Sequence, residues 1–368
     1  MHAAASTRKR SKRSKRWHIT SQLDRGSETA SRKGDHVRIN IERDVAAKGV
    51  ASGFERYRLI NCALPEIDLQ DVDTSCIVFG RRLRAPLLVS CMTGGTQEAG
   101  AINQTLARVA QEQGLAMGLG SARALIEDPS LLGTFDVRPV APDVLLFANL
   151  GAVQLNKGYG VEECRKLLHM LKADALVLHL NAVQEAVQPE GDTCFRGLID
   201  KIARVCEKLD APVIVKEVGW GIAPDEVHAL FEAGVAAVDL AGAGGTSWSE
   251  VERYRITEPW RAGVAAAFAG WGIPTAECLR RAVEMGPYGL LIASGGIRTG
   301  IDVVKALALG ADLVGIAGPF LRAAAHSFET ATDLAREYVE VLRIAMFALG
   351  EPTLARLRAT KRIVRERD

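Results

Sequence analysis

The sequence has none of the long apolar segments or paired cysteines that mark membrane-spanning and disulfide-linked proteins. Across its 368 residues, no uninterrupted apolar run approaches the roughly 18 to 20 residues that cross a bilayer. The N-terminus is charged but lacks the apolar segment of a signal peptide. The seven cysteines are scattered, without a C-x-x-C pair, which indicates reduced thiols. We therefore expect a cytoplasmic protein with no membrane association.

A strong overall charge is also absent. The chain carries 46 Lys and Arg against 44 Asp and Glu, a formal net charge of +2. Residues 1–33 hold ten of the basic side chains and only two acidic ones, so the remaining 335 residues have a net charge of −6. Because the positive excess is confined to a short tail, the charge gives no general argument for nucleic-acid binding, and we expect no nucleic-acid partner.

The basic run RKRSKRSKR at residues 8–16 cannot pack into a core, because its like charges repel one another. We therefore expect residues 1–30 to be a disordered basic extension and residues 31–368 to form a single domain. An arm for nucleic acid or an anionic surface and a plain solvated extension both fit this run. The second is favoured because basic runs alone are a weak pattern.

Eight short apolar runs recur beyond the tail, and most of them precede a helical pattern. Continuous apolarity is typical of strands buried on both faces of a parallel sheet. Strand followed by helix, eight times, predicts a (β/α)8 TIM barrel in the α/β class. An open doubly wound sheet shares the alternation, but no G-x-G-x-x-G follows the first run, which favours closure. The runs are residues 87–92, 115–120, 144–151, 175–181, 213–219, 237–245, 290–296 and 313–320.

The segments between these runs support the same architecture. Amphipathic patterns at residues 161–172, 195–209 and 302–310 predict helices. The interval between the sixth and seventh runs is longer than the others, which predicts an additional excursion around residues 247–285.

Polar and glycine residues gather where the apolar runs end. Reacting groups of a barrel lie at the C-terminal ends of its strands, so these residues predict one active site. Each has a purely structural explanation by itself, but their coincidence at seven or eight strand ends favours function. They are Met92 to Gly95, Ser121, Asn149, His179 with Asn181, Lys216 with Glu217, Gly242 to Thr246, Gly295 to Arg298, and Ala317 with Gly318.

Three of these groups indicate specific chemistry. Residues 294–300 (SGGIRTG) and 316–320 (IAGPF) offer backbone N–H groups for a phosphate. Lys216 requires an anion or acceptors in the barrel mouth, and a reduced flavin ring would supply them. In residues 179–192, Glu185 is free to hold Mg2+ that bridges to a diphosphate.

Distinctive sequence blocks recur along the chain from residue 32 to about residue 345. They are RKGDH (32–36), NCALPEID (61–68), APLLVSCMTGG (85–95), GLGSAR (118–123), ANLGA (148–152), HLNAVQEAVQPEGD (179–192), VKEVGWGI (215–222), DLAGAGGTSWSEVE (239–252) and SGGIRTGIDVVKALALGADLVGIAGPFL (294–321). In this order the blocks resemble those of the type 2, FMN-dependent isopentenyl diphosphate isomerases. The HLN-x-x-QE loop and the GAGGTSW turn are the most specific blocks, whereas SGGIRTG with ALGA occurs in many FMN barrels.

The resemblance implies that residues 31–368 are an FMN-binding TIM-barrel catalytic domain. Its implied FMN-binding residues are Met92, Thr93, Gly94, Ser121, Asn149, Lys216 and Thr246, with the phosphate at Gly296, Ile297, Arg298, Ala317 and Gly318. Its implied substrate-binding residues are Arg32, Lys33, Ser121, Ala122, Arg123 and Gln184. Its implied metal ligand is Glu185 for Mg2+, and its implied catalytic residues are Gln184, His179, Asn181 and Lys216.

The sequence departs from the family pattern at three positions. Ala122 stands where Gln is common, which removes any side-chain contact there, Asp35 replaces a Glu, and Ala182 replaces a common Pro. None of these changes removes a charged group from the expected site.

The resemblance implies conversion of isopentenyl diphosphate to dimethylallyl diphosphate in isoprenoid biosynthesis. A proton is added at the terminal alkene carbon and another is removed from the allylic position, using reduced FMN, with NADPH as its reductant. The family also implies a homo-oligomer, either a tetramer or an octamer. Because alkene carbons are weakly basic, the proton donor must be held in a dry, ordered site.

Three alternative functions remain. An FMN-dependent oxidoreductase of the 2-hydroxy-acid oxidase type shares the barrel, but it needs a His and Arg turn where this chain has AGAGGTS at residues 241–247. An IMP dehydrogenase needs a nucleophilic Cys after the sixth strand, and none lies between Cys206 and Cys278. A binding protein that acts through its basic tail would lose its function on deletion of residues 1–30.

Overall fold

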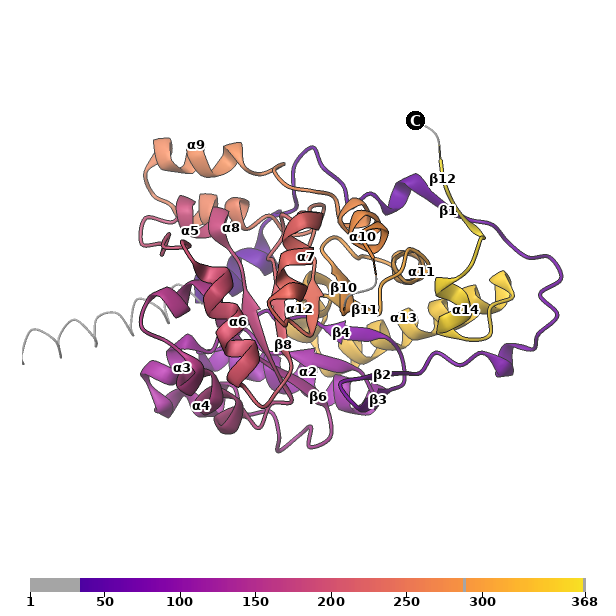
Figure 1. Cartoon of the computed structure of the whole chain (residues 1–368), viewed down its shortest axis with the longest axis horizontal. Coiled ribbons are helices and arrows are strands. Elements are labelled where there is room, and N and C mark those ends of the chain that lie inside the picture. The colour runs from indigo at the N-terminus through magenta and orange to yellow at the C-terminus, as the bar shows by residue number, and fades with distance from the viewer. Residues whose placement is uncertain (1–33, 287–288, 367–368) are drawn as a thin grey trace, which may run out of the picture.

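A computed structural model of the chain describes residues 34–286 and 289–366. Eight parallel strands close into a barrel in the order β10-β11-β4-β5-β6-β7-β8-β9. Figure 1 shows the barrel with its surrounding helices. Each strand falls within one of the eight predicted apolar runs, so the (β/α)8 prediction is confirmed. The predicted disordered extension, residues 1–30, lies outside the described residues. The strands are β4 (Leu87–Val89), β5 (Ala116–Gly118), β6 (Leu145–Gly151), β7 (Ala175–His179), β8 (Val213–Lys216), β9 (Ala237–Asp239), β10 (Leu290–Ser294) and β11 (Leu313–Ile316).

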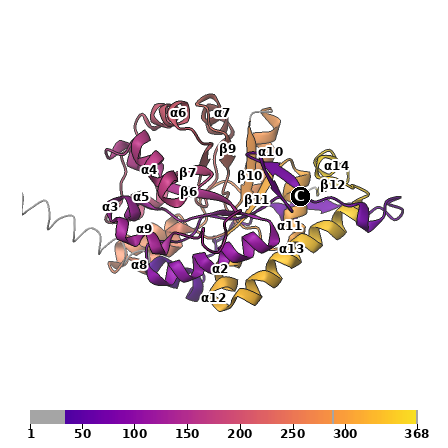
Figure 2. The ribbon, with the colours of Figure 1, turned by 90° about the horizontal axis from the view of Figure 1, so that it is seen from below.

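Helices surround the barrel and cover the outer faces of its strands (Figure 2). The predicted amphipathic segments form α4 (Val161–Leu171), α6 (Leu198–Lys208) and α11 (Gly300–Ala308). The predicted excursion after the sixth strand forms α8 (Trp248–Arg255), α9 (Pro259–Ala267) and α10 (Thr275–Glu284). The other α-helices with assigned bounds are α2 (Gln97–Gln113), α3 (Arg123–Glu127), α5 (Ala182–Val187), α7 (Pro224–Glu232), α12 (Gly318–His326), α13 (Phe328–Leu349) and α14 (Leu354–Arg358). None of the helices in the described ranges combines the length and apolar character needed to cross a membrane.

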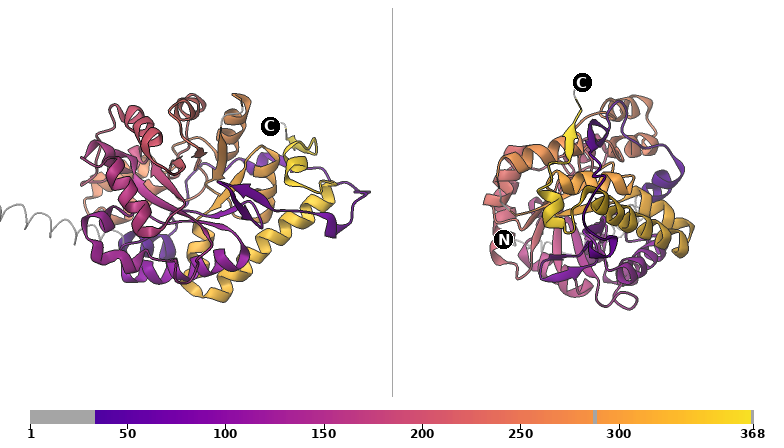
Figure 3. Two further views of the ribbon diagram at one scale, coloured as in Figure 1. Left: turned by 60° about the horizontal axis from the view of Figure 1, so that its bottom comes forward. Right: turned by 90° about the vertical axis from the view of Figure 1, so that its right-hand side faces the viewer.

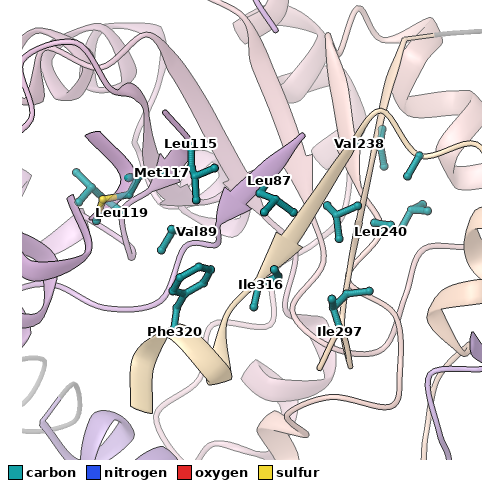
Figure 4. Close-up of a cluster of buried hydrophobic side chains, with 14 of the residues drawn as sticks. Leu87, Val89, Leu115, Met117, Leu119, Val238, Leu240, Ile297, Ile316 and Phe320 are labelled. Carbon is teal, nitrogen blue, oxygen red and sulfur yellow. The ribbon is translucent and has the colours of Figure 1, made fainter. Parts of the chain in front are cut away.

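Two hydrophobic clusters stabilise the barrel. One fills its interior with side chains such as Leu88, Phe147 and Ile292. The other lies between strands and helices, where Leu87, Met117 and Leu119 belong to a single buried set, as Figure 4 shows. Burial on both faces explains why the strand sequences are continuously apolar rather than alternating.

An antiparallel hairpin contributes to the interior cluster at the N-terminal end of the barrel. It consists of β2 (Cys76–Val78) and β3 (Arg81–Leu83), and its Val78 and Leu83 are buried within that cluster. Figure 1 shows the hairpin at the end opposite α5, α8 and α9. The hairpin therefore covers the end of the barrel that is remote from the predicted site.

The C-terminal helices run along one flank of the barrel (Figure 3). Tyr338 of α13 is buried, and its hydroxyl donates a 2.9 Å hydrogen bond to the carbonyl of Arg298 in the loop after β10. The chain ends in β12 (Ile363–Arg365), which pairs with β1 (Tyr57–Leu59) outside the barrel. The C-terminal region thus supports the loop that is predicted to bind phosphate.

The first described segment of the chain packs beside the loop that follows β9. Residues 34–42 are helical, and the backbone beyond them pairs with that loop. Ala47 N–H donates to the Gly245 carbonyl at 2.9 Å, and Ser247 N–H donates to the Val45 carbonyl at 2.8 Å. Val45 also joins Val251 of α8 in a small buried cluster. These contacts hold the segment against the C-terminal end of the barrel.

Candidate active site

A cavity of about 710 Å3 opens at the C-terminal ends of the barrel strands. Residues between His36 and Ala46 form one wall, and the strand ends and their loops form the rest. The structure brings nearly all the predicted site residues together here. Those that line the cavity are Met92, Thr93, Gly94, Ser121, Arg123, Asn149, His179, Asn181, Gln184, Glu185, Lys216, Thr246, Gly296, Ile297, Arg298, Ala317 and Gly318.

One predicted substrate-binding residue among the described ones, Ala122, does not line the cavity. Ala122 is fully buried beneath it, and its backbone N–H donates to the Asn149 carbonyl at 2.8 Å. Arg32 and Lys33 lie outside the described residues. Ala122 therefore supports the wall through its backbone, between Ser121 and Arg123, which do line the cavity.

A glycine cradle follows β10, where the sequence predicts a phosphate site. Gly295 and Gly296 have φ angles of +97° and +74°, which favour glycine. The backbone N–H groups of Arg298 and Thr299 both donate to the Asp302 carboxylate, at 3.1 and 2.9 Å. Asp302 thus caps this helix start, and the available donors of the cradle come from the residues before Arg298. Gly318, at the start of α12, faces the same cavity and adds a helix N-terminus.

The cavity floor contains a buried polar atom that lacks a partner. Ser90 is 1% exposed and lines the cavity, and its hydroxyl has no hydrogen-bond partner among the described residues. The next strand along the barrel carries Gly315, where a Cβ would lie 2.5 Å from that hydroxyl. Because buried polar groups are nearly always paired, the Ser90 hydroxyl points to a bound group with polar atoms. The glycine leaves room for that group.

Asn149 and His179 form a second polar pair on the floor. The Nδ1 atom of His179 lies 2.8 Å from Asn149 Oδ1, and the two residues come from adjacent strands, β6 and β7. Because the amide oxygen is an acceptor, Nδ1 carries the proton in this contact. This bond fixes the orientation of the imidazole.

Lys216 extends from the end of β8 into this polar floor. Its Nζ donates to the carbonyl of Glu217 at 2.8 Å and lies 3.4 Å from Asp239 Oδ2. The side chain is largely buried, so the ammonium depends on these partners and on whatever occupies the cavity.

Glu217 organises the loop after β8. Its Oε2 accepts hydrogen bonds from the backbone N–H groups of Val218, Gly219, Trp220 and Gly221, at 2.6 to 3.2 Å. Burial raises the pKa of the Glu217 carboxyl to about 7, while the backbone N–H groups favour its charged form. The carboxylate therefore gives this loop a fixed shape beside Lys216.

The loop after β7 forms a connected set of amides and carboxylates. Asn181 Nδ2 donates to Gln184 Oε1 at 3.2 Å and to Glu185 Oε1 at 2.8 Å. The second carboxylate oxygen, Glu185 Oε2, accepts from Asp192 N–H at 2.5 Å. Arg123 and Lys157 each form an ion pair with Asp192, which ties the end of this loop to the neighbouring wall.

Glu252 of α8 connects this loop to the N-terminal segment. Its Oε1 accepts from Gln184 Nε2 at 2.9 Å, from Gln188 Nε2 at 2.8 Å and from His36 Nε2 at 3.0 Å. Arg255 Nε donates to Oε2 at 2.9 Å. Burial raises the pKa of Glu252, but the hydrogen bonds and the charges around it outweigh burial and lower it to about 2. Glu252 is therefore a carboxylate at neutral pH.

Our sequence-based prediction missed the roles of His36, Gln188 and Glu252. His36 and Glu252 stand in the RKGDH and DLAGAGGTSWSEVE blocks, so the blocks themselves were a signal. Nothing in the sequence indicated that these two side chains pair with each other, because 216 positions separate them.

No cluster of three His, Cys, Asp or Glu side chains within residues 34–286 and 289–366 can hold a metal ion by itself. A cation at Glu185 would therefore take most of its ligands from a bound phosphate or from water. Mg2+ commonly binds in that way, through one or two carboxylates together with substrate phosphates.

Comparisons with known proteins agree with this fold. The family described as FMN-dependent dehydrogenase matches residues 179–365. Solved structures of a mandelate oxidase variant and of a Pediococcus acidilactici lactate oxidase share the fold. Their TM-scores are 0.62 and 0.64, their identities 20% and 17%, and they cover 91% and 94% of this chain and 97% and 95% of their own chains.

Much closer relatives occur among curated proteins. Isopentenyl-diphosphate delta-isomerase from Nostoc sp. is 51% identical over 90% of this chain and 95% of its own length. The protein of that name from Synechocystis sp. is 52% identical, over 89% and 94% respectively. The chain therefore belongs to the type 2, FMN-dependent family of isopentenyl-diphosphate delta-isomerases.

Proposed function

We propose that the protein interconverts isopentenyl diphosphate and dimethylallyl diphosphate with FMN bound at the barrel mouth. The observation that carries this proposal is the high identity, over nine-tenths of the chain, to proteins with that name. The cavity supports it, because it gathers all the residues that the family resemblance assigns to FMN, together with Ser121, Arg123 and Gln184 of those that it assigns to the diphosphate.

The residues of the cavity fit FMN. The Gly295–Gly296 cradle and the start of α12 offer backbone donors for its phosphate. The unpaired hydroxyl of Ser90 and the ammonium of Lys216 offer polar contacts for its ring. When bound in its reduced form, FMN supplies the acid-base group for proton exchange with the alkene.

The loop after β7 and Glu252 would then hold the substrate in one orientation. The Gln184 amide is fixed at both ends, since its Nε2 donates to Glu252 and its Oε1 accepts from Asn181. His179 is fixed in the same way by Asn149. Because an alkene carbon is protonated only when donor and carbon are well aligned, such rigidity lowers the barrier of the step.

The N-terminal segment would exclude water from this step. His36 joins the segment to Glu252, and backbone pairing joins Val45 and Ala47 to the loop after β9. A site closed on this side protects a reactive carbocation-like centre from hydration and strengthens electrostatic interactions inside.

The diphosphate would lie near Arg123, Gln184 and Glu185, with Mg2+ between the Glu185 carboxylate and the phosphates. NADPH as the reductant, a homo-oligomeric assembly and a cytoplasmic location complete the proposal on the strength of the family resemblance. A 2-hydroxy-acid oxidase function is not favoured, because residues 241–247 lack the His and Arg of that turn.

Replacing Glu185 by glutamine is expected to raise the Mg2+ concentration for half-maximal rate at least about tenfold. A neutral amide is a poorer ligand for a hard dication than a carboxylate. The measurement is a titration of the isomerisation rate with Mg2+, with Glu190→Gln as the control on the same loop. An identical titration for wild type and Glu185→Gln would place the ion elsewhere.

Deleting residues 1–30 is expected to leave the KM for isopentenyl diphosphate nearly unchanged, whereas Arg32→Ala in the truncated protein raises it at least tenfold. Three residues of chain separate Arg32 from His36, which lines the cavity. A charge-assisted contact to phosphate contributes about 1.5 to 3 kcal/mol. Steady-state kinetics of both proteins test this expectation. A larger loss from truncation alone would place the basic extension in the site.

The proposal as a whole is tested by the visible spectrum of the purified protein and by its product. We expect flavin absorbance and, after anaerobic reduction, dimethylallyl diphosphate from isopentenyl diphosphate. A protein that cannot be loaded with FMN would contradict the proposal.

A further inference from the structure

A further buried carboxylate, Asp239 on β9, lies behind the cavity wall. Its side chain is 2% exposed and does not belong to the cavity lining. The carboxylate has two side-chain contacts: Lys216 Nζ lies 3.4 Å from Oδ2, and the Ser294 hydroxyl donates to Oδ1 at 2.5 Å. Both Lys216 and Ser294 line the cavity. Any effect of Asp239 on a bound group is therefore exerted through these neighbours and through its charge.

The barrel fixes this arrangement. Lys216 and Asp239 are register partners on the parallel strands β8 and β9, and Ser294 closes the adjacent strand β10. Strand pairing sets the backbone positions of all three residues, so the lysine and the carboxylate meet without any contribution from flexible loops.

Contacts within the protein use two of the three N–H donors of the Lys216 ammonium and leave one for a group bound in the cavity. An ammonium has three N–H donors. One is used by the Glu217 carbonyl, and the ion pair with Asp239 accounts for a second. A buried carboxylate next to a buried ammonium also offsets its charge, and loss of either partner leaves the other uncompensated.

We propose that Asp239 is a positioning residue that holds the Lys216 ammonium at the cavity floor and offsets part of its charge, thereby setting how strongly bound FMN favours its reduced form. This inference rests on the FMN site of the proposed function. A reduced flavin that carries negative charge is stabilised by the lysine and opposed by the carboxylate.

The two residues should therefore shift the reduction of bound FMN in opposite directions. Asp239→Asn keeps the shape and an oxygen acceptor for Lys216 but removes the negative charge, so the reduced form becomes more favoured. Lys216→Met removes the positive charge and makes the reduced form less favoured. A role of Asp239 in folding alone predicts no such opposition of sign.

The experiment is an anaerobic reductive titration of the FMN holoenzyme against a reference dye, together with a measured Kd for FMN. We expect Asp239→Asn to shift the two-electron equilibrium at least tenfold towards reduced FMN, about 30 mV. Lys216→Met should shift it the other way. Asp312→Asn is the control, because Asp312 lies before β11 at the opposite end of the barrel and should leave the equilibrium unchanged.

A folded Asp239→Asn protein that binds FMN with an unchanged or lowered midpoint potential would overturn the inference. If that variant fails to fold, Ser294→Ala carries the test. It leaves the Asp239 charge without its hydroxyl donor and should lower the potential, and an unchanged or raised potential would contradict the inference. These readouts do not depend on turnover, so an enzyme without isomerase activity would refute the proposed function separately.

Discussion

Glu252→Gln is expected to lower kcat for isopentenyl diphosphate at least about 100-fold while changing KM much less. The carboxylate accepts four hydrogen bonds, three of them at Oε1, and an amide cannot accept at both ends. The amide NH2 of the variant would face a donor in either orientation, Arg255 on one side or the three donors of Oε1 on the other, so one side of this network must rearrange. A 100-fold loss corresponds to about 3 kcal/mol of transition-state stabilisation.

The matched control for this variant is Glu250→Gln on the same helix. Glu250 is 3% exposed and pairs with Arg253, so its loss also removes a buried carboxylate but leaves the Gln184 network intact. The control should melt at a lower temperature and retain near wild-type kcat. Equal losses of kcat in the two variants would mean that Glu252 only stabilises α8.

Lys216→Ala is expected to weaken FMN binding or abolish turnover without unfolding the barrel. The substitution removes one charge from a polar floor rather than volume from the hydrophobic core. Flavin absorbance of the purified protein measures retained FMN, and thermal melting followed by circular dichroism measures folding.

Lys305→Ala provides the control for truncation of a lysine. Lys305 is half-buried and also donates to a backbone carbonyl, that of Phe54, but it lies on α11 away from the cavity lining. It should keep both FMN and activity. Wild-type rates with full FMN in Lys216→Ala would remove Lys216 from the mechanism.

The barrel was predictable because burial on both faces leaves a local trace in each strand. Every strand from β4 to β11 has a run of apolar residues, and each run ends in the small or polar residues that line the cavity. The hairpin of β2 and β3 left no such trace. Each of its three-residue strands buries only its last side chain, Val78 or Leu83, and β3 begins with two exposed arginines, so the pair lacks the runs of buried apolar residues that mark the barrel strands.

The residues of the candidate site at the strand ends were predictable, but the side chains that hold them in position were not. Glu252 and His36 meet only because the N-terminal segment folds back across the barrel mouth, and a charged residue in a helix gives no sequence sign of burial. The role of Asp239 was not predictable either, because it depends on a contact with Lys216 between two neighbouring strands that are distant in sequence. The capping of α11 by Asp302 likewise changes which backbone donors of the SGGIRTG loop are available.

Isomerisation in D2O tests the central claim most directly. Reduced FMN holoenzyme, Mg2+ and isopentenyl diphosphate are incubated anaerobically, and the product is analysed by nuclear magnetic resonance and mass spectrometry. We expect dimethylallyl diphosphate that carries deuterium in the methyl group formed from the terminal alkene carbon, with no stoichiometric consumption of NADPH. Absence of this product from a protein that is fully loaded with reduced FMN, or one NADPH oxidised per turnover, would contradict the account.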